Sequence, residues 1–182
     1  FEILADKLPE TVNLHFSNSS AIRYAQLFEF KTNSIHCNRG TSGIDGCTST
    51  AMGFAMKAKE QTVLVTGDVS FFYDINGLWN NYIPPYTRII VFNNGGGDIF
   101  KIIPGPSSTN ALEEFILTKH HKNAEYLAKH FGFAYTKVDD EDTLSRVLDN
   151  FFKHDVKAKI LEVDTSAIEN AAVLKAYFEY LK

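Results

Sequence analysis

Short apolar runs rich in β-branched residues alternate along this chain with stretches in which apolar residues recur at helical spacing. The first pattern is typical of buried strands, and the second of helices that cover a sheet. Together they predict an α/β fold with a doubly wound, mostly parallel sheet and helices on both faces. The predicted strands are residues 12–16, 34–37, 62–66, 88–92, 134–138 and 158–163, and the predicted helices are residues 1–8, 20–30, 48–58, 124–131, 143–153 and 168–181.

One long segment, residues 95–122, interrupts this alternation. It has no regular apolar spacing and contains Pro104, Gly105 and Pro106. Loops of this length in compact domains are usually functional or mobile. It also contains the pair His120-His121, which we expect to lie in a polar stretch of the loop and not to bind a metal.

Composition and charge narrow the function more than the fold. With 182 residues, 45% of them hydrophobic, residues 1–182 are expected to form one domain with a sizeable core. No apolar run has the length of a bilayer span. The net charge of −4 gives no general reason to bind nucleic acid or acidic membranes. Because the chain begins with Phe1 inside a predicted helix, we expect it to be a piece of a longer polypeptide.

The two cysteines bear on the cellular compartment. Cys37 and Cys47 lack the spacing of metal ligands, and a disulfide between them would stabilise little. Free thiols in a reducing, cytoplasmic compartment are therefore expected rather than a disulfide.

Polar, glycine-containing strings follow two of the predicted strands. Gly67-Asp68-Val69 follows residues 62–66, and Asn93-Asn94-Gly95-Gly96-Gly97 follows residues 88–92. In a parallel sheet these strand ends lie at one edge, about 4.8 Å apart. Their carboxylate and amide oxygens suit Mg²⁺ or Ca²⁺, and glycines allow a diphosphate to approach backbone N–H groups. The alternative for Asp68 alone is a helix cap, but the pair predicts a metal–diphosphate site.

Two of the arginines flank loops at the same predicted edge of the sheet. Arg23 is expected in the first turn of its helix, where the macrodipole disfavours a cation, and Arg39 lies in the turn-rich loop 38–46. Both are candidates to bind a carboxylate or phosphate, with a surface ion pair as the alternative. Asp45, in the same loop, is expected to cap the next helix.

At this point the motifs resemble a known family. Gly67-Asp68 followed by Asn93-Asn94 is similar to the thiamine diphosphate motif, with Val69 standing where a third glycine is usual. Over essentially the whole chain the sequence further resembles the carboxyl-terminal third of the 2-succinyl-5-enolpyruvyl-6-hydroxy-3-cyclohexene-1-carboxylate synthase family of menaquinone biosynthesis. The matching strings are Asn18-Ser19, Asn38 to Gly46, Gly67 to Ser70, Tyr73-Asp74, and Asn93 to Phe100.

The resemblance implies a role for each matching residue. Asp68, Asn94 and the Gly96 carbonyl would bind Mg²⁺ or Mn²⁺. Ser42, Gly43, Gly67, Val69 and Ser70 would surround thiamine diphosphate, with Ile44 as the apolar wedge that bends it and Ile99 against it. The implied substrate-binding residues are Ser19, Arg23, Arg39, Ile99, Phe100 and Ile103.

The implied reaction is a transfer between small anionic molecules. It decarboxylates 2-oxoglutarate and adds the resulting succinyl carbanion to isochorismate. The activating glutamate of the family lies in an amino-terminal domain that this sequence lacks, and a partner subunit supplies it, so a homodimer or homotetramer is implied. The fragment alone is therefore expected to be inactive. Two alternatives stay open: another thiamine diphosphate-dependent 2-oxoacid decarboxylase or synthase, and a non-catalytic metal–diphosphate-binding module.

Overall fold

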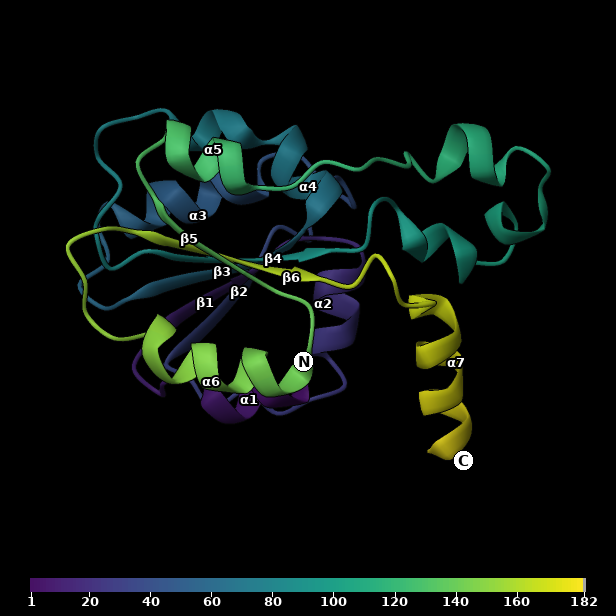
Figure 1. Ribbon diagram of the computed structural model, residues 1–182, viewed down its shortest axis with the longest axis horizontal. Coiled ribbons are helices and arrows are strands. Elements are labelled where there is room, and N and C mark those ends of the chain that lie inside the picture. The colour runs from purple at the N-terminus through teal and green to yellow at the C-terminus, as the bar shows by residue number, and fades with distance from the viewer. Residues whose placement is uncertain (182) are drawn as a thin grey trace.

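A six-stranded, all-parallel sheet forms the centre of the structure, a computed structural model that describes residues 1–181. The strand order is β2-β1-β3-β4-β6-β5, and helices lie on both faces (Figure 1), so the predicted doubly wound α/β fold is confirmed. The strands are β1 (Asn13–Phe16), β2 (Ser34–Cys37), β3 (Thr62–Gly67), β4 (Arg88–Asn93), β5 (Ala134–Val138) and β6 (Lys159–Asp164). The α-helices are α1 (Glu2–Lys7), α2 (Ser20–Ala25), α3 (Cys47–Ala55), α4 (Asp68–Tyr73), α5 (Glu125–His130), α6 (Glu141–Phe151) and α7 (Asn170–Tyr180).

Alternate residues of the central strands feed two separate apolar cores, one on each face of the sheet. Val63 and Val65 of β3 belong to the core beneath α1 and α6, whereas Leu64 between them belongs to the core beneath α3, α4 and α5. Because successive side chains of a strand point to opposite faces, a strand buried on both sides reads as a continuous apolar run. This explains why the central strands could be predicted from sequence.

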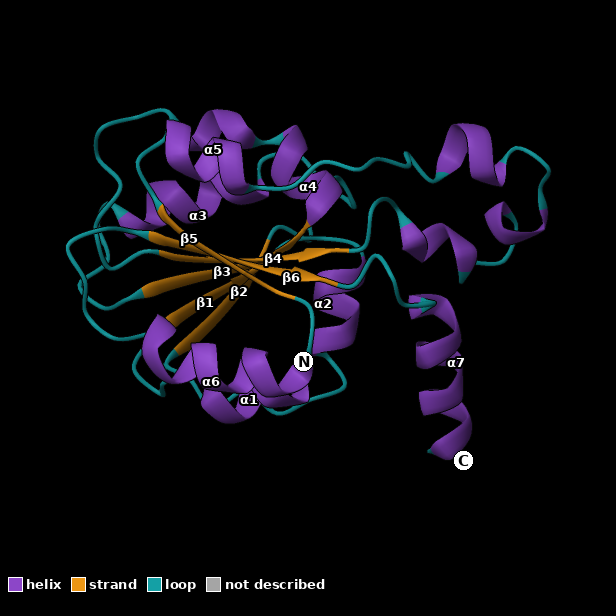
Figure 2. Ribbon diagram, viewed as in Figure 1, coloured by secondary structure: helices purple, strands orange, loops and turns teal. Residues whose placement is uncertain are grey.

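The order of the strands fixes the position of a crevice. The chain moves from β1 to β2 on one side and from β3 to β4 on the other, so the direction of winding reverses between β1 and β3. In open α/β sheets ligands bind beyond the carboxyl ends of the strands at such a reversal. The segment between β4 and α5 and the helix α7 both extend beyond this edge (Figures 1 and 2).

Two helical predictions differ from the structure. The helix expected to reach residue 30 ends at Ala25, because the chain turns there and the Phe30 ring packs edge-on against Phe16 of the core, with 5.3 Å between the ring centroids. The segment predicted to be irregular, residues 95–122, contains short helical turns at Asp98–Lys101, Pro106–Ser108 and Leu112–Ile116.

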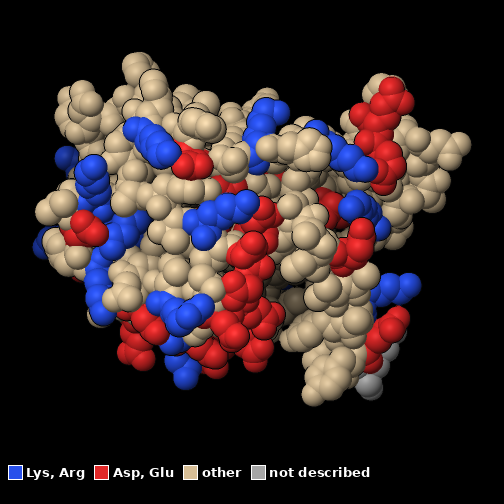
Figure 3. Space-filling view, in the orientation of Figure 1, with Lys and Arg blue, Asp and Glu red and all other residues tan. Residues whose placement is uncertain are grey.

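The surface gives little guidance to function. On the face drawn in Figure 3 charges of both signs are present, and a group of acidic side chains lies over α1 and α6. None of the helices within residues 1–181 is long and apolar enough to cross a membrane. Both cysteines are free thiols, as predicted.

Candidate functional site

A cavity of about 540 Å³ opens at the reversal of winding between β1 and β3. Residues that follow β1, β3 and β4 line it, together with the loop before α3. Every site residue predicted from sequence lines this cavity except Arg39. The predicted residues that do so are Ser19, Arg23, Ser42, Gly43, Ile44, Gly67, Asp68, Val69, Ser70, Asn94, Gly96, Ile99, Phe100 and Ile103.

Asp68 is the buried carboxylate of this cavity. It is the first residue of α4, and its side chain is 3% exposed. One oxygen, Oδ1, accepts a hydrogen bond from Val69 N at 2.7 Å, and the other, Oδ2, accepts from Gly95 N at 2.9 Å and Gly96 N at 3.0 Å. Burial raises the pKa of Asp68 to about 6, although these three N–H groups oppose the shift. Hydrogen bonds from backbone N–H groups therefore stabilise the Asp68 carboxylate only in part, and a bound cation would stabilise it further.

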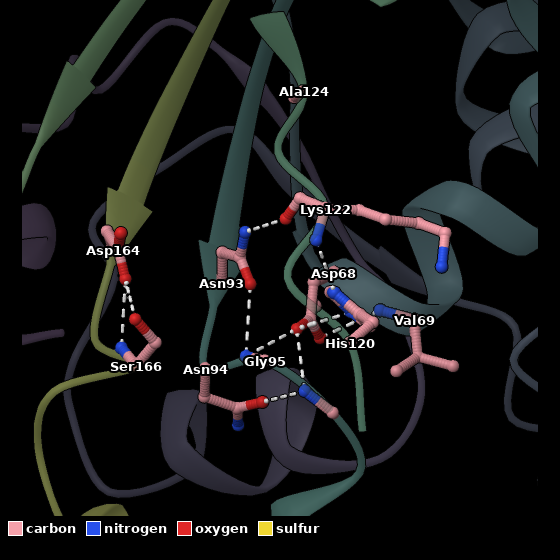
Figure 4. Close-up of polar contacts among 12 residues, drawn as sticks. Asp68, Val69, Asn93, Asn94, Gly95, His120, Lys122, Ala124, Asp164 and Ser166 are labelled. Carbon is pink, nitrogen blue, oxygen red and sulfur yellow. Dashed lines mark hydrogen bonds and ion pairs between the residues drawn. The ribbon is translucent and has the colours of Figure 1, made fainter. Parts of the chain in front are cut away.

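Asn94 brings a second oxygen to the same place. Its Oδ1 accepts from Gly96 N at 3.1 Å, the amide that also donates to Asp68 Oδ2. The two side chains thus share one donor, which places their oxygens beside each other (Figure 4). β3 and β4 are parallel neighbours, with Gly67 opposite Phe92, so the predicted convergence of two strand ends is confirmed.

The glycines after β4 have a different use from the one expected. The N–H groups of Gly95 and Gly96 donate to side chains of this chain, and Gly97 N donates to Leu117 O at 2.6 Å. They are therefore engaged and not free to meet a diphosphate. Gly96 has φ of +157°, and a Cβ there would lie 2.6 Å from Leu117 O. Glycine is needed at this position because the backbone of the opposite side of the loop passes so close.

Asn18, which follows β1, organises the loop 38–46. Its amide nitrogen donates to Asn38 O and Gly43 O, both at 2.5 Å, and its Oδ1 accepts from Arg39 Nη1 at 3.2 Å. Arg39 is consequently fixed at the edge of the cavity through Asn18, without lining it. Sequence reasoning singled out Asn18 only as part of a matching motif, and its position two residues after the predicted strand 12–16 was the available signal.

Two further residues of this region differ from expectation. The N-cap of α3 is Gly46, with no side-chain cap, so the prediction that Asp45 caps this helix is wrong. Asp45 lines the cavity instead, and its carboxylate folds back over Gly43. The Ser70 hydroxyl donates to Ile44 O at 2.7 Å, which joins α4 to the loop. A bond from that hydroxyl to a phosphate requires this contact to break.

Arg23 lines the cavity for a different reason from the one predicted. Because α2 ends at Ala25, Arg23 lies in the last turn of the helix, not the first. A cation is favoured there, so the argument from an unfavourable dipole is wrong. Its Nη1 donates to Ser19 O at 3.0 Å, and Ser19 itself has φ of +73°. Residues held in such strained conformations cluster at functional sites.

His120 is the residue that sequence reasoning missed. It is not in a polar, exposed stretch: its side chain is 7% exposed, and its Nε2 lies 3.2 Å from Asp68 Oδ2. Burial lowers the pKa of His120, which favours the neutral ring. No spacing or neighbouring residue indicates this contact, because the loop 95–122 has no regular pattern from which to place it.

A buried network fixes the base of that loop, and Figure 4 shows the part of it that joins Asn93 to Gly95 and Lys122. Asn93 donates to Lys122 O at 2.9 Å and to Glu162 Oε1 at 2.5 Å, and its Oδ1 accepts from Gly95 N at 3.0 Å. The other oxygen of Glu162 accepts from Ala124 N at 2.8 Å and from the Tyr135 hydroxyl at 2.6 Å. Both ends of the loop are thus connected to β6 through Glu162. Of the two asparagines, Asn93 holds this network together and Asn94 lines the cavity.

The donors at the cavity fit a hard divalent cation. Asp68 and Asn94 supply a carboxylate and an amide oxygen side by side, the ligand types that Mg²⁺ and Mn²⁺ accept. Asp68 Oδ1 accepts only one N–H among the described residues, so it keeps a lone pair for an ion. The residues present therefore fit the metal that the motif implies.

Comparison with known proteins agrees with this geometry. The family "Thiamine pyrophosphate enzyme, C-terminal TPP binding domain" matches residues 19–161. The chain belongs to this family. An X-ray structure of a protein from Mycobacterium smegmatis, assigned as a thiamin diphosphate-dependent enzyme, superposes with a TM-score of 0.67 over 90% of this chain and 30% of that one. At 22% sequence identity this likeness supports the fold alone.

Relatives with higher identity carry one name. The chain is 50% identical over its whole length to 2-succinyl-5-enolpyruvyl-6-hydroxy-3-cyclohexene-1-carboxylate synthase of Flavobacterium psychrophilum, covering 33% of that protein. It is 46% identical to the synthase of the same name from Christiangramia forsetii, over 97% of this chain and 31% of that protein. The chain therefore spans about a third of the length of the curated relatives it matches.

Proposed function

We propose that this chain is the metal- and diphosphate-binding part of a thiamine diphosphate-dependent 2-succinyl-5-enolpyruvyl-6-hydroxy-3-cyclohexene-1-carboxylate synthase. The observation that carries the proposal is the convergence of Asp68 and Asn94 on Gly96 N in a chain that aligns over its full length with relatives of that name. The whole protein decarboxylates 2-oxoglutarate and adds the succinyl unit to isochorismate. Residues 1–182 form one domain of it, in the cytoplasm.

The metal is Mg²⁺ or Mn²⁺, held by Asp68, Asn94 and the carbonyl of Gly96. Such a metal would supply positive charge to the diphosphate. Gly67, Val69 and Ser70 would hold the diphosphate end of the cofactor, and the apolar Ile44 would support its middle. When bound, thiamine diphosphate supplies the electron sink for decarboxylation, while this chain supplies position and charge.

The substrates are anionic, and two cations stand at or beside the cavity. Arg23 lines it and Arg39 is fixed at its edge by Asn18. Each guanidinium can bind a carboxylate through two parallel hydrogen bonds. Ser19 adds a hydroxyl. Ile99, Phe100 and Ile103 provide an apolar wall that excludes water from the reacting carbon.

The site is incomplete in one chain. The predicted site residues provide oxygen ligands and cations, and the family resemblance assigns none of them to activation of the aminopyrimidine. We propose that a second subunit provides the activating carboxylate, so that the active site lies between subunits of a homodimer or homotetramer. The isolated 182-residue chain is accordingly expected to show no synthase activity.

The test is an assay of the full-length parent with 2-oxoglutarate and isochorismate, with and without thiamine diphosphate and Mg²⁺. Product that requires both cofactors supports the proposal. The variant Arg39→Ala is expected to lower addition to isochorismate strongly while cofactor affinity, measured by calorimetry, stays unchanged. Decarboxylation of other 2-oxoacids without any dependence on isochorismate would contradict the proposal and point to a different thiamine-dependent enzyme.

A further inference from the structure

We infer that His120, at the end of the loop that follows β4, is a positioning residue that orients Asp68 for the metal. The inference rests on the proposed function, because it assigns to a side chain of this chain a role toward the proposed metal. Its basis is a contact between a buried imidazole and a buried carboxylate that no sequence motif predicts.

The imidazole lies beside the carboxylate. Nε2 lies 3.2 Å from Asp68 Oδ2, and it has no aligned hydrogen-bond partner among the residues described. The ring packs edge-on against Phe72, with 5.3 Å between the ring centroids. A buried polar atom without an aligned partner costs free energy, so its retention at this position needs a reason. Hydrogen bonds at sites without ligand are often loose and tighten on binding.

The second ring nitrogen settles which atom bears the proton. Nδ1 accepts a hydrogen bond from Lys122 N at 3.1 Å, and an accepting nitrogen carries no hydrogen. In the neutral ring the proton is therefore on Nε2, which faces Asp68 as a donor. For the same reason His120 is not a metal ligand itself: the lone pair of Nδ1 is used by Lys122 N, and the protonated Nε2 has none to offer.

The consequence falls on the two oxygens of Asp68. Oδ2 is faced by Gly95 N, Gly96 N and His120 Nε2, whereas Oδ1 accepts only from Val69 N. Two aligned N–H donors hold Oδ2 and His120 Nε2 lies beside it, so the carboxylate is oriented with its other oxygen left for an ion. Groups that orient metal ligands in this way change metal affinity by about 10- to 100-fold when they are removed.

The backbone around His120 keeps the ring in register with the glycine loop. His120 N donates to Gly95 O at 3.0 Å, and Gly97 N donates to Leu117 O. Asn93 Nδ2 holds Lys122 O at 2.9 Å. The ring is therefore held close to the carboxylate by the hydrogen bonds of the loop, and we expect their contact to align when the metal binds.

The experiment uses the full-length parent enzyme and measures the Kd for Mn²⁺ from the electron paramagnetic resonance signal of free Mn²⁺, with saturating thiamine diphosphate. His120→Phe and His120→Leu keep an apolar group of similar bulk and remove the donor, and both are expected to weaken Mn²⁺ binding about tenfold or more. His120→Gln keeps an N–H donor near the position of Nε2 and is expected to bind within about threefold of the wild type. His121→Phe, at the exposed neighbour, is the matched control and should change nothing.

The outcomes separate this inference from the proposed function. If the wild type binds neither Mn²⁺ nor thiamine diphosphate, the proposed function fails. If the wild type binds both, and the Phe and Leu variants bind Mn²⁺ equally tightly, the inference alone is overturned. It is also overturned if His120→Gln binds as weakly as the Phe variant, since packing and not the donor would then matter. If the Phe variant does not fold, the Leu and Gln variants decide.

Discussion

A buried ionisable side chain lies at each end of β4, and the two differ in how completely their polar atoms are hydrogen-bonded. At the start, Arg88 is fully buried, and its guanidinium donates to Phe151 O at 2.6 Å, Pro85 O at 2.8 Å, Thr87 O at 2.9 Å and Lys153 O at 2.7 Å. At the other end, Asp68 beside Asn94 keeps an unshared oxygen, and His120 Nε2 has no aligned partner among the residues described.

The difference separates a structural site from a binding site. Arg88 donates to the backbone carbonyls of Phe151 and Lys153 at and after the end of α6, so it joins the helix to the sheet, and four of its five N–H groups are engaged within the chain. The group around Asp68 is held in place from one side only, and a cavity lies on the other. Buried polar atoms without a hydrogen-bond partner cost free energy. Their presence at a cavity indicates a ligand that binds to them.

The largest expected effect is at Asp68. In the full-length enzyme, Asp68→Asn removes the negative charge that binds the metal, and kcat/KM is expected to fall about a thousandfold or more. Calorimetry with thiamine diphosphate and Mg²⁺ should show a parallel loss of cofactor binding. The control is Asp164→Asn at the end of the neighbouring strand β6, where Lys137 and Ser166 hold the carboxylate, and its activity should be unchanged. Equal activity of Asp68→Asn and wild type would remove the distinction between the two ends of β4.

The converse substitution is Arg88→Met. It leaves the carbonyls of Phe151 and Lys153 without their donor, and the free energy of unfolding of this chain is expected to fall by about 3 kcal/mol, measured by urea denaturation. Arg146→Met on the exposed face of α6, where the guanidinium contacts only its own helix, should change it by less than about 0.5 kcal/mol. A loss of cofactor affinity with stability intact would show that Arg88 belongs to the site after all.

Sequence alone predicted one of these ends and not the other. The run from Arg88 to Phe92 marked the strand, and Asp68 with Asn94 marked the site, because residues that follow adjacent parallel strands must lie at one edge. Nothing marked Arg88 as buried, since an arginine at the start of a strand is ordinarily exposed. Its burial depends on where α6 ends, and that contact joins residues 63 positions apart.

The site residues that could be predicted from sequence are mostly those next to predicted strands or in the loop 38–46. The strand ends and the loop 38–46 supplied much of the cavity lining, but Ser20, Ala21, Tyr73, Asp98 and Thr118 are among the lining residues that were not predicted. Two structural features also escaped prediction. The length of α2 depends on the packing of Phe30 against Phe16, which propensity cannot supply, and the burial of His120 depends on a loop that returns to Gly95 through tertiary hydrogen bonds.

His15 is a third buried ionisable side chain, and it lies at neither end of β4. It tests whether a buried polar atom without a partner has an energetic cost away from the cavity. It lies in β1, stacks on His36 of β2 and contacts Phe54, and its Nε2 has no partner among the residues described. Burial, with a smaller contribution from His36, lowers the pKa of His15 from 6.5 to about 4. Between these two pH values His15 is protonated in the unfolded chain and neutral in the folded chain. The free energy of unfolding therefore falls as the pH falls.

Between about pH 8 and about pH 5 this one group is expected to cost about 2 kcal/mol of unfolding free energy. His15→Gln should remove that part of the pH dependence in urea denaturation, whereas the exposed His121→Gln should keep it. An unchanged slope for His15→Gln would show that a buried side chain without a partner does not by itself indicate an energetic cost in this fold.

The smallest effect is expected at Gly96, where the comparison concerns shape and not charge. A methyl group at this position would lie 2.6 Å from Leu117 O, in a backbone conformation that side chains rarely adopt. The loop must then move, and it carries with it the amide that Asp68 and Asn94 share. The strain of about 1–3 kcal/mol is expected to weaken Mn²⁺ binding by the full-length enzyme about tenfold. Gly53→Ala, in the exposed middle of α3 where a Cβ meets nothing within 4 Å, is the matched control and should leave Mn²⁺ affinity as it is.

If both variants bind Mn²⁺ equally, the glycine loop tolerates displacement and does not position the two oxygens. If only Gly96→Ala loses affinity, the metal site depends on the backbone geometry of the glycine loop as well as on the Asp68 carboxylate.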